Sequence, residues 1–283
     1  MNWQRRYLRV SLYLNGKLTN LLNEDLAVTF NTSEAVSGGL NETNITIGGL
    51  RTDTMFYLAT ANTQWVKNWQ INRIVIDAGY YYNHGVVFDG VIMEAKPNLT
   101  NADFSITIKA MSMFAELMNP KSYTFAGDTT VNSIAKKFAD DLGLVLDSSV
   151  DNSIMVNNFN LRDQSAVDGI RSLSQSTGLD IFESRGRLYV KKPDEGINKG
   201  KQLVINSGDI IGIPEPTPTG VNIKVRMNPS FISGQRVRVN SLRYPQLKSY
   251  NFFIMTISNA GATKGSEWTT HLNLVKEGMG FWQ

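Results

Sequence analysis

The sequence predicts a mostly β protein with an α+β insert, in which two antiparallel β units, each a sheet or a barrel, flank a small α+β domain. Apolar residues alternate with period two in the first and last thirds, and they change to a helical period near residue 130. The 283 residues also exceed a typical single domain. We therefore predict three units: residues 1–119 as a first β unit, 120–195 as the α+β domain and 196–283 as a second β unit.

The first unit contains short alternating strands. From Leu8 to Leu14 every second residue is apolar, and Asn15-Gly16 follows as a hairpin turn signal because both residues tolerate positive φ. The same alternation predicts further strands at Leu26–Phe30, around Ile45 and Ile47, and at Arg73–Asp77, Val86–Ala95 and Phe104–Ala110. We expect Pro97 and Asn98 to separate the last two of these strands.

The middle unit changes to helical spacing. A first helix is predicted from the apolar residues Val131, Ile134, Ala135, Phe138 and Leu142. Asp128 or Thr129 is its expected N-cap, and Gly143 its expected end. A second helix is predicted over Ser165–Ser176 with Gly178 after it, and a hairpin over Asp180–Lys192 with Arg185-Gly186 at the turn.

The last unit returns to strands. Pro214, Pro216 and Pro218 predict a stiff extended connector, because each proline fixes φ and disfavours helix before it. Alternation then predicts strands at Val221–Met227, Arg236–Ser241, Asn251–Asn259 and Thr269–Lys276. The chain thus follows a β–(α+β)–β plan.

The composition argues against several function classes. The net charge of +3 is scattered, so no basic face for nucleic acid is evident. There are no cysteines, and no apolar run approaches the roughly 20 residues that span a bilayer. The first ten residues do not form a signal peptide, so we expect synthesis in the cytoplasm.

No catalytic, cofactor or metal site is predicted. The two histidines, His84 and His271, have no second ligand at a metal-like spacing, and nucleotide-binding and hydrolase motifs are absent. Acidic residues could in principle form a catalytic pair. Asp140, Asp141, Asp163, Asp168 and Asp180 are candidates by residue type alone, and no spacing supports them. We therefore interpret them as solvated acids.

Aromatic residues are the candidate contacts with other proteins. Large apolar side chains in loops are typical of surfaces that become buried in an assembly. The predicted interface residues are Trp65, Trp69, Tyr80, Tyr81, Tyr82, Phe281 and Trp282.

Three stretches, taken in order, carry a family resemblance. They are Val86–Leu99 with the strand that follows, the helical segment Phe159–Val190, and Val221–Ser241 followed by Ser266–Leu272. Their succession resembles the baseplate hub proteins of contractile phage tails, which include the late-control D family and the N-terminal part of type VI secretion spike proteins. The resemblance covers most of the chain, although each stretch alone is generic.

The resemblance implies a structural virion protein located in the tail baseplate. Such hubs are homotrimers in which two barrels per chain resemble the tail-tube fold, so that three chains present a pseudo-sixfold ring to the hexameric tube. The resemblance thus implies that both β units, residues 1–119 and 196–283, are barrels. The implied partners are the tail tube protein, a separate central spike protein, and other baseplate and tape-measure proteins. DNA would pass through the lumen during ejection without sequence-specific binding.

Two other functions stay open on the sequence. The stretch from Tyr123 to Leu144 is similar to a LysM motif, which would indicate a peptidoglycan-binding accessory of a tail lytic protein. A trimeric receptor-binding tail protein would also be rich in β structure. The capped, amphipathic helix in this stretch is explained equally well as a packing element of the middle unit.

Overall fold

The computed structural model describes residues 5–14, 17–22, 26–36, 40–61, 71–100, 103–112, 119–197 and 202–279. The helices are α1 (Thr52–Ala61), α3 (Val131–Asp141), α4 (Ala166–Thr177) and the 3-10 helix η1 (Pro245–Ser249). The strands of the first unit are β1 (Arg6–Leu14), β2 (Lys17–Leu22), β3 (Ala27–Ala35), β4 (Glu42–Gly48), β5 (Arg73–Tyr80), β6 (Asn83–Thr100) and β7 (Asp103–Met111).

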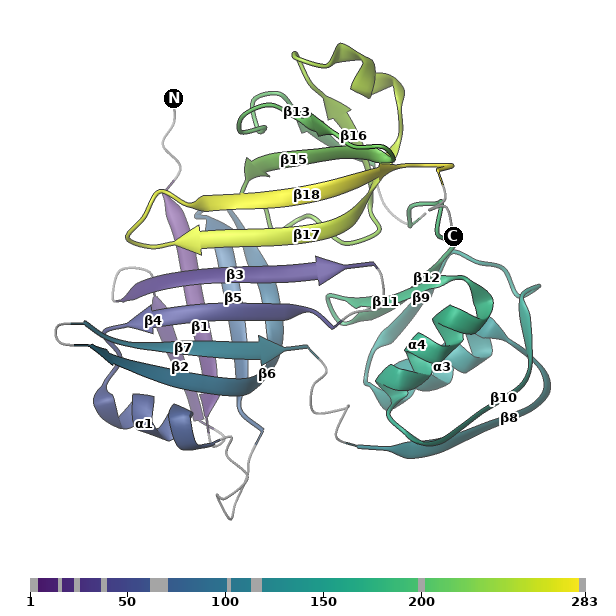
Figure 1. The fold of residues 1–283 in the computed structure, drawn as a ribbon, viewed down its shortest axis with the longest axis horizontal. Helices are drawn as coiled ribbons and strands as arrows, with labels where there is room; N and C mark the ends of the chain where they lie inside the picture. Colours follow the sequence, from purple (N-terminus) through teal and green to yellow (C-terminus); the bar gives the residue numbers. More distant parts are fainter. Residues whose placement is uncertain are drawn as a thin grey trace.

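The remaining strands belong to the insert and to the last unit. The insert contains β8 (Lys121–Thr130), β9 (Val145–Ser148), β10 (Met155–Gln164), β11 (Asp180–Ser184) and β12 (Arg187–Lys191). The last unit contains β13 (Leu203–Asn206), β14 (Glu215–Pro216), β15 (Gly220–Arg226), β16 (Arg236–Asn240), β17 (Phe252–Ala262) and β18 (Trp268–Lys276). The predicted mostly β fold with an α+β insert is confirmed (Figure 1).

One hydrogen-bonded sheet joins the first and last units. Its strand order is β14-β15-β18-β17-β3-β4-β7-β6-β5-β1-β2, and β13 and β16 complete its 13 strands. The two units meet where β17 pairs antiparallel with β3, for example at Asn259 opposite Thr32. The division into two separate barrels remains a prediction, because in the described residues both units share this single sheet.

The first unit folds its part of the sheet into two crossing layers. Strands β3 and β4 lie in front of β1 and β5, which run across them (Figure 1). The long strand β6 belongs to both layers, since it pairs with β5 over its first half and with β7 over its second. The expected break at Pro97 is wrong: Pro97 lies inside β6 opposite Ile106. A proline fits there because β7 is the only strand that pairs with this half of β6 in the described residues.

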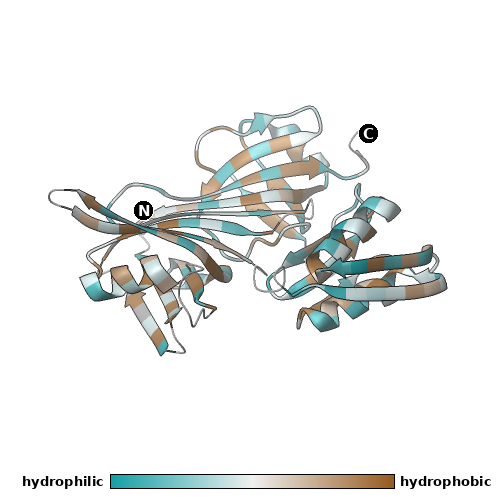
Figure 2. Cartoon of the chain, turned by 60° about the horizontal axis from the view of Figure 1, so that its bottom comes forward, coloured by the Kyte–Doolittle hydropathy of each residue, from teal (hydrophilic) through white to brown (hydrophobic). Residues whose placement is uncertain are grey.

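Alternation along the strands builds the core between the layers. Leu8, Val10 and Leu12 of β1 are buried in this core. Ile45 and Ile47 of β4 are buried in the same core from the facing layer. Figure 2 shows this pattern as alternating hydrophobic and hydrophilic bands along the strands. Such one-sided burial is what period-two sequence patterns predict.

Helix α1 closes one end of this core, and the residue pattern did not predict it. Met55 and Leu58 are buried in the core, and Ala61 follows one turn later on the same side. The helix is only ten residues long. Apolar Phe56 and Tyr57 also interrupt its stripe, so the helical period was hidden in the sequence.

The insert follows its predicted plan with one correction at a helix cap. Helix α4 is capped by Ser165, whose side chain accepts a hydrogen bond from the Asp168 amide, and it ends at left-handed Gly178 as predicted. Helix α3 is capped by Thr130 and not by the predicted Asp128 or Thr129. The reason is that β8 continues through Asp128 and Thr129, which pair with β10, so the helix starts one residue later.

Two small sheets complete the insert. Strand β8 pairs with β10, while β11 and β12 form the predicted hairpin and β9 adds parallel to β12. Arg185 and Gly186 both have positive φ, of 51° and 74°, as a two-residue hairpin turn requires. The apolar faces of α3 and α4 pack between these sheets. The Asn15-Gly16 turn predicted between β1 and β2 lies outside the described residues.

Candidate assembly surfaces

One face of the large sheet is covered by small polar side chains from both β units. The register aligns them in rows across the strands, such as His271, Ser258, Ser33 and Glu42 on β18, β17, β3 and β4. We call this surface the polar face. It consists of the uncharged residues Thr29, Asn31, Ser33, Asn44, Thr46, Thr107, Asn222, Ser258, His271 and Asn273, and of the charged residues Glu42, Lys109 and Lys224.

Side chains on the polar face also bond to one another across strands. The Thr46 and Thr107 hydroxyls are 3.0 Å apart, and Asn273 Nδ2 donates to Asn222 Oδ1 over 2.7 Å. Lysines on this face lie beside carboxylates: Lys224 contacts Glu267 at 3.0 Å and Lys109 lies 4.0 Å from Glu94, which also contacts Lys96 at 2.6 Å. The result is a hydrated surface with little unbalanced positive charge.

A buried polar cluster lies beneath this face at the β3–β17 junction. Asn259 is 5% exposed; its Nδ2 donates to Thr32 Oγ1 over 3.0 Å and its Oδ1 accepts from Thr270 Oγ1 over 2.7 Å. We call these three residues the seam cluster. Since the Asn259 amide reaches both hydroxyls only when β17 lies in this register against β3 and β18, the cluster helps to fix the register in which the two β units join.

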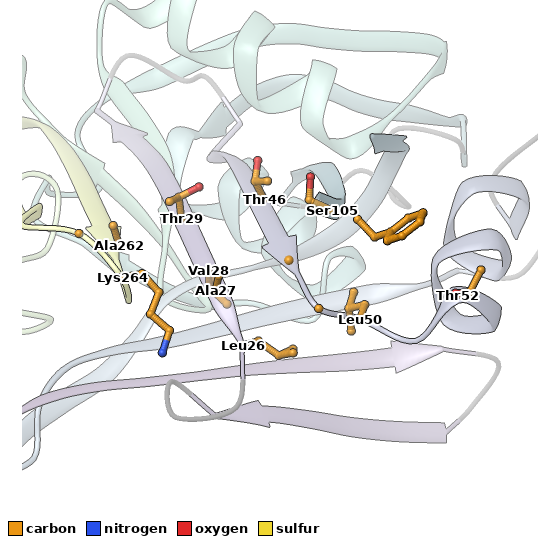
Figure 3. A pocket seen from close by; sticks show the side chains of 14 residues that line it. Leu26, Ala27, Val28, Thr29, Thr46, Leu50, Thr52, Ser105, Ala262 and Lys264 are labelled. Carbon is orange, nitrogen blue, oxygen red and sulfur yellow. The ribbon is translucent and has the colours of Figure 1, made fainter. Parts of the chain in front are cut away.

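An apolar groove lies at one end of the same strands (Figure 3). Leu26, Leu50 and Phe104 supply much of its wall, and Lys264 is the charged residue among those that line it. Phe104 is largely exposed. The groove lies between the start of α1 and the β17–β18 hairpin, at the ends of the strands, and it borders the polar face through Thr29 and Thr46.

Three of the seven predicted aromatic interface residues lie in the part of the chain that the structure describes. Tyr80 is half-buried against the core, whereas Tyr81 packs edge-on against Tyr7 with ring centroids 5.6 Å apart. Tyr82, at the tip of the β5–β6 hairpin, is 94% exposed. The other four predicted residues, Trp65, Trp69, Phe281 and Trp282, lie outside the described residues.

The histidines have no metal-like surroundings. His84 Nδ1 lies 2.9 Å from Asp77 Oδ1, and its ring stacks on Tyr7 with centroids 3.9 Å apart. His271 lies on the polar face. Among the described residues, no group of three or more metal-ligating side chains occurs, and no helix there has the length and apolarity to span a membrane.

Most of the acidic candidates have structural contacts. Asp140 and Asp141 each form an ion pair with a lysine one turn earlier in α3. Asp168 lies in the first turn of α4, where it accepts a hydrogen bond from Ser165 Oγ over 2.6 Å. Asp180 contacts a buried lysine, and Asp163 lies 3.5 Å from the Ser122 hydroxyl. The side chains of Asp141 and Asp180 are only 16% and 19% exposed, so the interpretation as solvated acids is wrong for these two.

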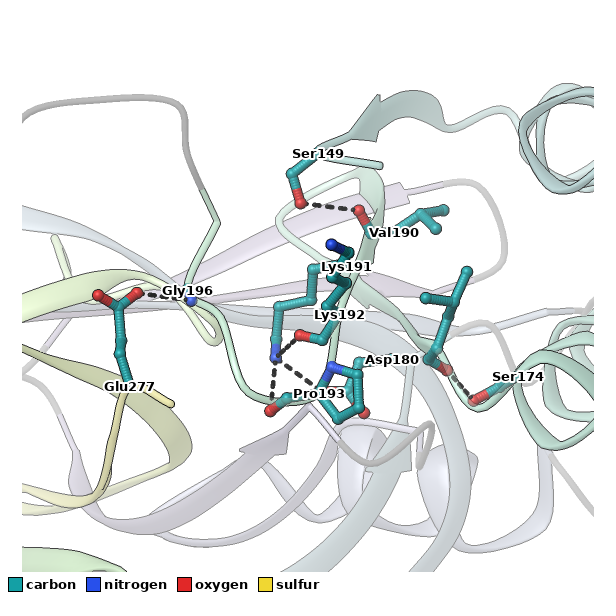
Figure 4. Close-up of polar contacts among 10 residues, drawn as sticks. Ser149, Ser174, Asp180, Val190, Lys191, Lys192, Pro193, Gly196 and Glu277 are labelled. Carbon is teal, nitrogen blue, oxygen red and sulfur yellow. Dashed lines mark hydrogen bonds and ion pairs between the residues drawn. The ribbon is translucent and has the colours of Figure 1, made fainter. Parts of the chain in front are cut away.

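A buried lysine ties the insert to the last unit (Figure 4). Lys191 is 0% exposed; its Nζ donates to Asp180 Oδ2 over 2.6 Å and to the Lys192 carbonyl over 3.0 Å. The same Nζ lies 4.3 Å from the Phe253 ring centroid in β17. Burial lowers the pKa of Lys191, while the Asp180 carboxylate opposes that change. These contacts hold the β11–β12 hairpin against the large sheet.

A second junction joins the insert to the first unit through Glu183. Its Oε2 accepts from Asn41 Nδ2 over 3.0 Å, and its Oε1 accepts from the Gly186 amide over 3.0 Å. Burial raises the pKa of Glu183 to about 7 from the usual 4.5, and the nearby Glu34 carboxylate adds to this. Between about pH 4.5 and 7, the folded protein therefore holds a proton on Glu183 that the unfolded chain releases.

We expect Glu183→Gln to flatten the pH dependence of stability. A raised folded-state pKa gives a contribution that is fully present below pH 4.5 and is lost as the pH rises to about 7. At pH 8 the variant should be more stable than the native protein by about 2 kcal/mol, allowing for partial solvent exposure. Urea unfolding at pH 5, 6, 7 and 8 measures this. The exposed Glu215→Gln is the control, and parallel curves for all three proteins would contradict the expectation.

Comparison with known proteins agrees with the fold. The family model described as baseplate hub gp41 matches residues 7–273. A search of curated proteins gave no significant match.

Solved structures with a similar fold come from phage tails and a type VI system. The prophage MuSo2 43 kDa tail protein from Shewanella oneidensis aligns with a TM-score of 0.62 at 10% identity, over 95% of this chain and 97% of that one. The tail protein from Neisseria meningitidis MC58 gives 0.58 at 14% identity, over 96% and 97%. The E. coli c3393 protein, a type VI secretion component similar in structure to T4 tail proteins gp27 and gp5, gives 0.58 at 10% identity, over 88% and 73%.

These identities are low, so the solved structures establish the shared fold. The family match establishes more, because it covers nearly the whole chain. The chain belongs to the baseplate hub gp41 family and is a structural component of a phage tail.

Proposed function

We propose that the chain forms a homotrimeric hub that joins the hexameric tail tube to a separate central spike protein. The observation that supports this most is the joining of two β units edge to edge through β3 and β17. Each chain then supplies two adjacent sheet segments, and three chains supply six. A threefold ring built in this way can match a sixfold tube.

The polar face is the surface that we propose lines the lumen. It continues without interruption over β4, β3, β17 and β18, so it belongs to both units at once. Hydroxyl and amide groups hydrate well, and they do not bind phosphate as clustered lysines or arginines do. DNA would therefore slide past this lining during ejection.

Other contacts follow from the same arrangement. Closing the sheet around an axis places strand ends on the two flat sides of the ring, so the apolar groove beside Phe104 and Lys264 would face the tube or the spike. Tyr81 and the exposed Tyr82 are proposed contacts between copies or with other tail proteins, together with Trp65, Trp69, Phe281 and Trp282. The role is structural, with no catalytic step, and synthesis would take place in the host cytoplasm before assembly into the virion baseplate.

The oligomeric state is the direct test of the proposal. Mass photometry of the purified protein should show a trimer, and electron microscopy should show a ring with a central opening. A protein that stays monomeric at every concentration, and in the presence of tube and spike proteins, would contradict it.

Adding positive charge to the polar face should slow DNA ejection. Asn31→Lys combined with Ser258→Lys places two cations on adjacent strands near the middle of the proposed lining. We expect trimers of normal stability, but DNA release from virions at least about fivefold slower at low salt, with the difference shrinking as salt rises. Asn160→Lys with Asn206→Lys adds the same charge at exposed positions elsewhere. Equal ejection rates for the two double variants would rule out the proposed lining.

A further inference from the structure

The main path of the large sheet ends in two strands that differ in their ability to pair further, and β13, which pairs only with β16 in the described residues, forms the edge of a side branch. At one end lies β14, the Glu215–Pro216 part of the proline-rich segment, and at the other end lies β2. A sheet edge presents unpaired N–H and C=O groups that can accept another strand. Along an edge strand, the backbone N–H and C=O of every second residue point away from the sheet. Whether those outward groups are present decides whether the edge can pair with another strand.

The prolines of the β14 edge stand at its outward positions. Thr217 and Gly220 exchange both backbone hydrogen bonds, at 3.0 and 3.4 Å, so Thr217 points its groups inward toward β15. Alternation then points Glu215 inward, opposite Asn222, and points Pro214 and Pro216 outward. Since proline has no N–H, the outward donors of this edge are missing. The segment that the sequence indicated as a connector therefore also blocks this edge against further pairing.

The β2 edge, in contrast, keeps its outward backbone donors and acceptors. The Tyr81 amide donates to the Arg5 carbonyl over 3.1 Å, which shows that odd-numbered residues of β1 point toward β5. Even-numbered residues of β1 therefore point toward β2, where Leu12 faces Thr19 and Val10 faces Leu21. Thr19 and Leu21 thus bond to β1, while Leu18, Asn20 and Leu22 point their backbone groups outward.

Nothing in the described part of the chain uses these outward groups. No described strand pairs with β2 other than β1, and none of the loop hydrogen bonds among described residues involves Leu18, Asn20 or Leu22. The side chain of Leu18 is 52% exposed and lies opposite Tyr13, which is also exposed. Lys17 next to it is exposed as well.

We propose that β2 receives an extended segment of a separate tail protein, which adds to the sheet as a further strand. Three outward residues at alternate positions supply donors and acceptors along the edge, as strand addition requires. The exposed Leu18 and Tyr13 favour an apolar side chain in the incoming strand, and Lys17 favours a nearby carboxylate. A second copy cannot continue the sheet by placing its β14 edge here, because that edge lacks outward donors. Pairing with the β13 edge or the β2 edge of a second copy is the competing outcome that the exchange experiment below tests.

The position of β2 indicates where this partner lies. Strands β1 and β2 belong to the layer behind β3 and β4, on the side of the core away from the polar face (Figure 1). If the polar face lines the lumen, as proposed above, β2 lies on the outside of the ring. The partner would then be a protein that surrounds the hub, and neither the tube nor DNA.

Hydrogen exchange tests the proposal in the native particle. In the purified hub, the amides of Leu18, Asn20 and Leu22 should exchange at least about tenfold faster than those of Thr19 and Leu21. In assembled tails all five should be protected. Outward amides that exchange equally fast in tails would overturn the proposal. Protection already complete in the purified hub would assign the edge to a second copy, and would also overturn it.

A pair of variants supplies an independent test. Asn20→Pro removes one outward N–H and leaves the bonds to β1 intact, whereas Asn20→Val changes the same side chain and keeps the N–H. We expect Asn20→Pro to enter tails at less than about one-tenth of the native level and Asn20→Val to enter normally. Normal entry of Asn20→Pro would overturn the proposal. If Asn20→Pro fails to fold, the exchange experiment on the native protein decides.

The experiments distinguish a failure of the trimeric ring from a failure of strand addition at β2. Mass photometry of the purified hub reports ring formation without any partner of β2. Protected β2 amides in tails together with a monomeric purified hub would contradict the trimeric ring and leave strand addition standing.

Discussion

Replacing Phe138 with alanine is expected to unfold the insert at a denaturant concentration that leaves both β units intact. Phe138 is 0% exposed at the centre of an aromatic cluster, with its ring centroid 5.0 Å from Tyr123 and 6.3 Å from Phe159. A methyl group on Gly169 of α4 would lie 2.6 Å from its ring, which shows how closely the helices pack. Truncation should cost about 3–5 kcal/mol, because packing this close leaves little room for collapse into the cavity.

Two spectroscopic signals separate the parts of the chain. The insert contains no tryptophan, whereas Trp268 is buried at the β17–β18 hairpin. Ellipticity at 222 nm follows mainly α3 and α4, with a smaller part from α1 of the first unit, and tryptophan fluorescence follows the β units. In Phe138→Ala most of the helical signal should be lost at lower urea than the fluorescence signal, while the exposed Lys136→Ala should behave like the native protein. Coincident transitions in the variant would show that insert and sheet unfold as one unit.

Replacing Asn259 with alanine is expected to weaken the junction of the two β units by about 3 kcal/mol. The substitution removes the partner of two buried hydroxyls, those of Thr32 and Thr270, and leaves a small cavity between three strands. Since this junction holds the two halves of the polar face together, the variant should also give fewer trimers at equal protein concentration. Urea unfolding followed by fluorescence and mass photometry measure the two effects.

Two further variants test whether the loss of stability in Asn259→Ala comes from the seam cluster. Ser258→Ala changes the neighbouring residue on the exposed side of β17, and it should alter stability by less than about 0.5 kcal/mol. Thr32→Val, Asn259→Leu and Thr270→Val together replace the whole cluster by apolar groups, which should recover much of the stability lost in Asn259→Ala. Equal stability of Asn259→Ala and the native protein would show that the hydrogen bonds at the seam contribute nothing.

Local structure was predictable from the sequence wherever one residue pattern dominated. The alternation from Leu8 to Leu14 predicted β1, because one face of that strand is buried along its whole length. Ser165 and Gly178 predicted the ends of α4, since caps depend on residues within a single turn. The Thr130 cap was missed by one residue because pairing of β8 with β10 decides where α3 begins.

Long-range pairing was not predictable in the same way. Nothing in Thr32 or Asn259 alone shows that strands more than 200 residues apart are neighbours, since both residues are ordinary in exposed strands. The polar face was therefore invisible as a unit, although each strand showed its own polar half. Register information, which a single sequence lacks, was needed to place Ser33 beside Ser258.

The β3–β17 junction also has a consequence for synthesis of the chain. Strand β3 ends at Ala35 and its partner begins at Phe252, so the ribosome adds about 200 residues between them, which takes about 10–40 s. During that time the edge of β3 is open in a half-made protein at high local concentration on polysomes. Thr29, Asn31 and Ser33 on that strand are polar on their exposed side, which lowers the attraction between nascent chains. The residues that we assign to the lumen of the finished ring thus protect the chain before the ring exists.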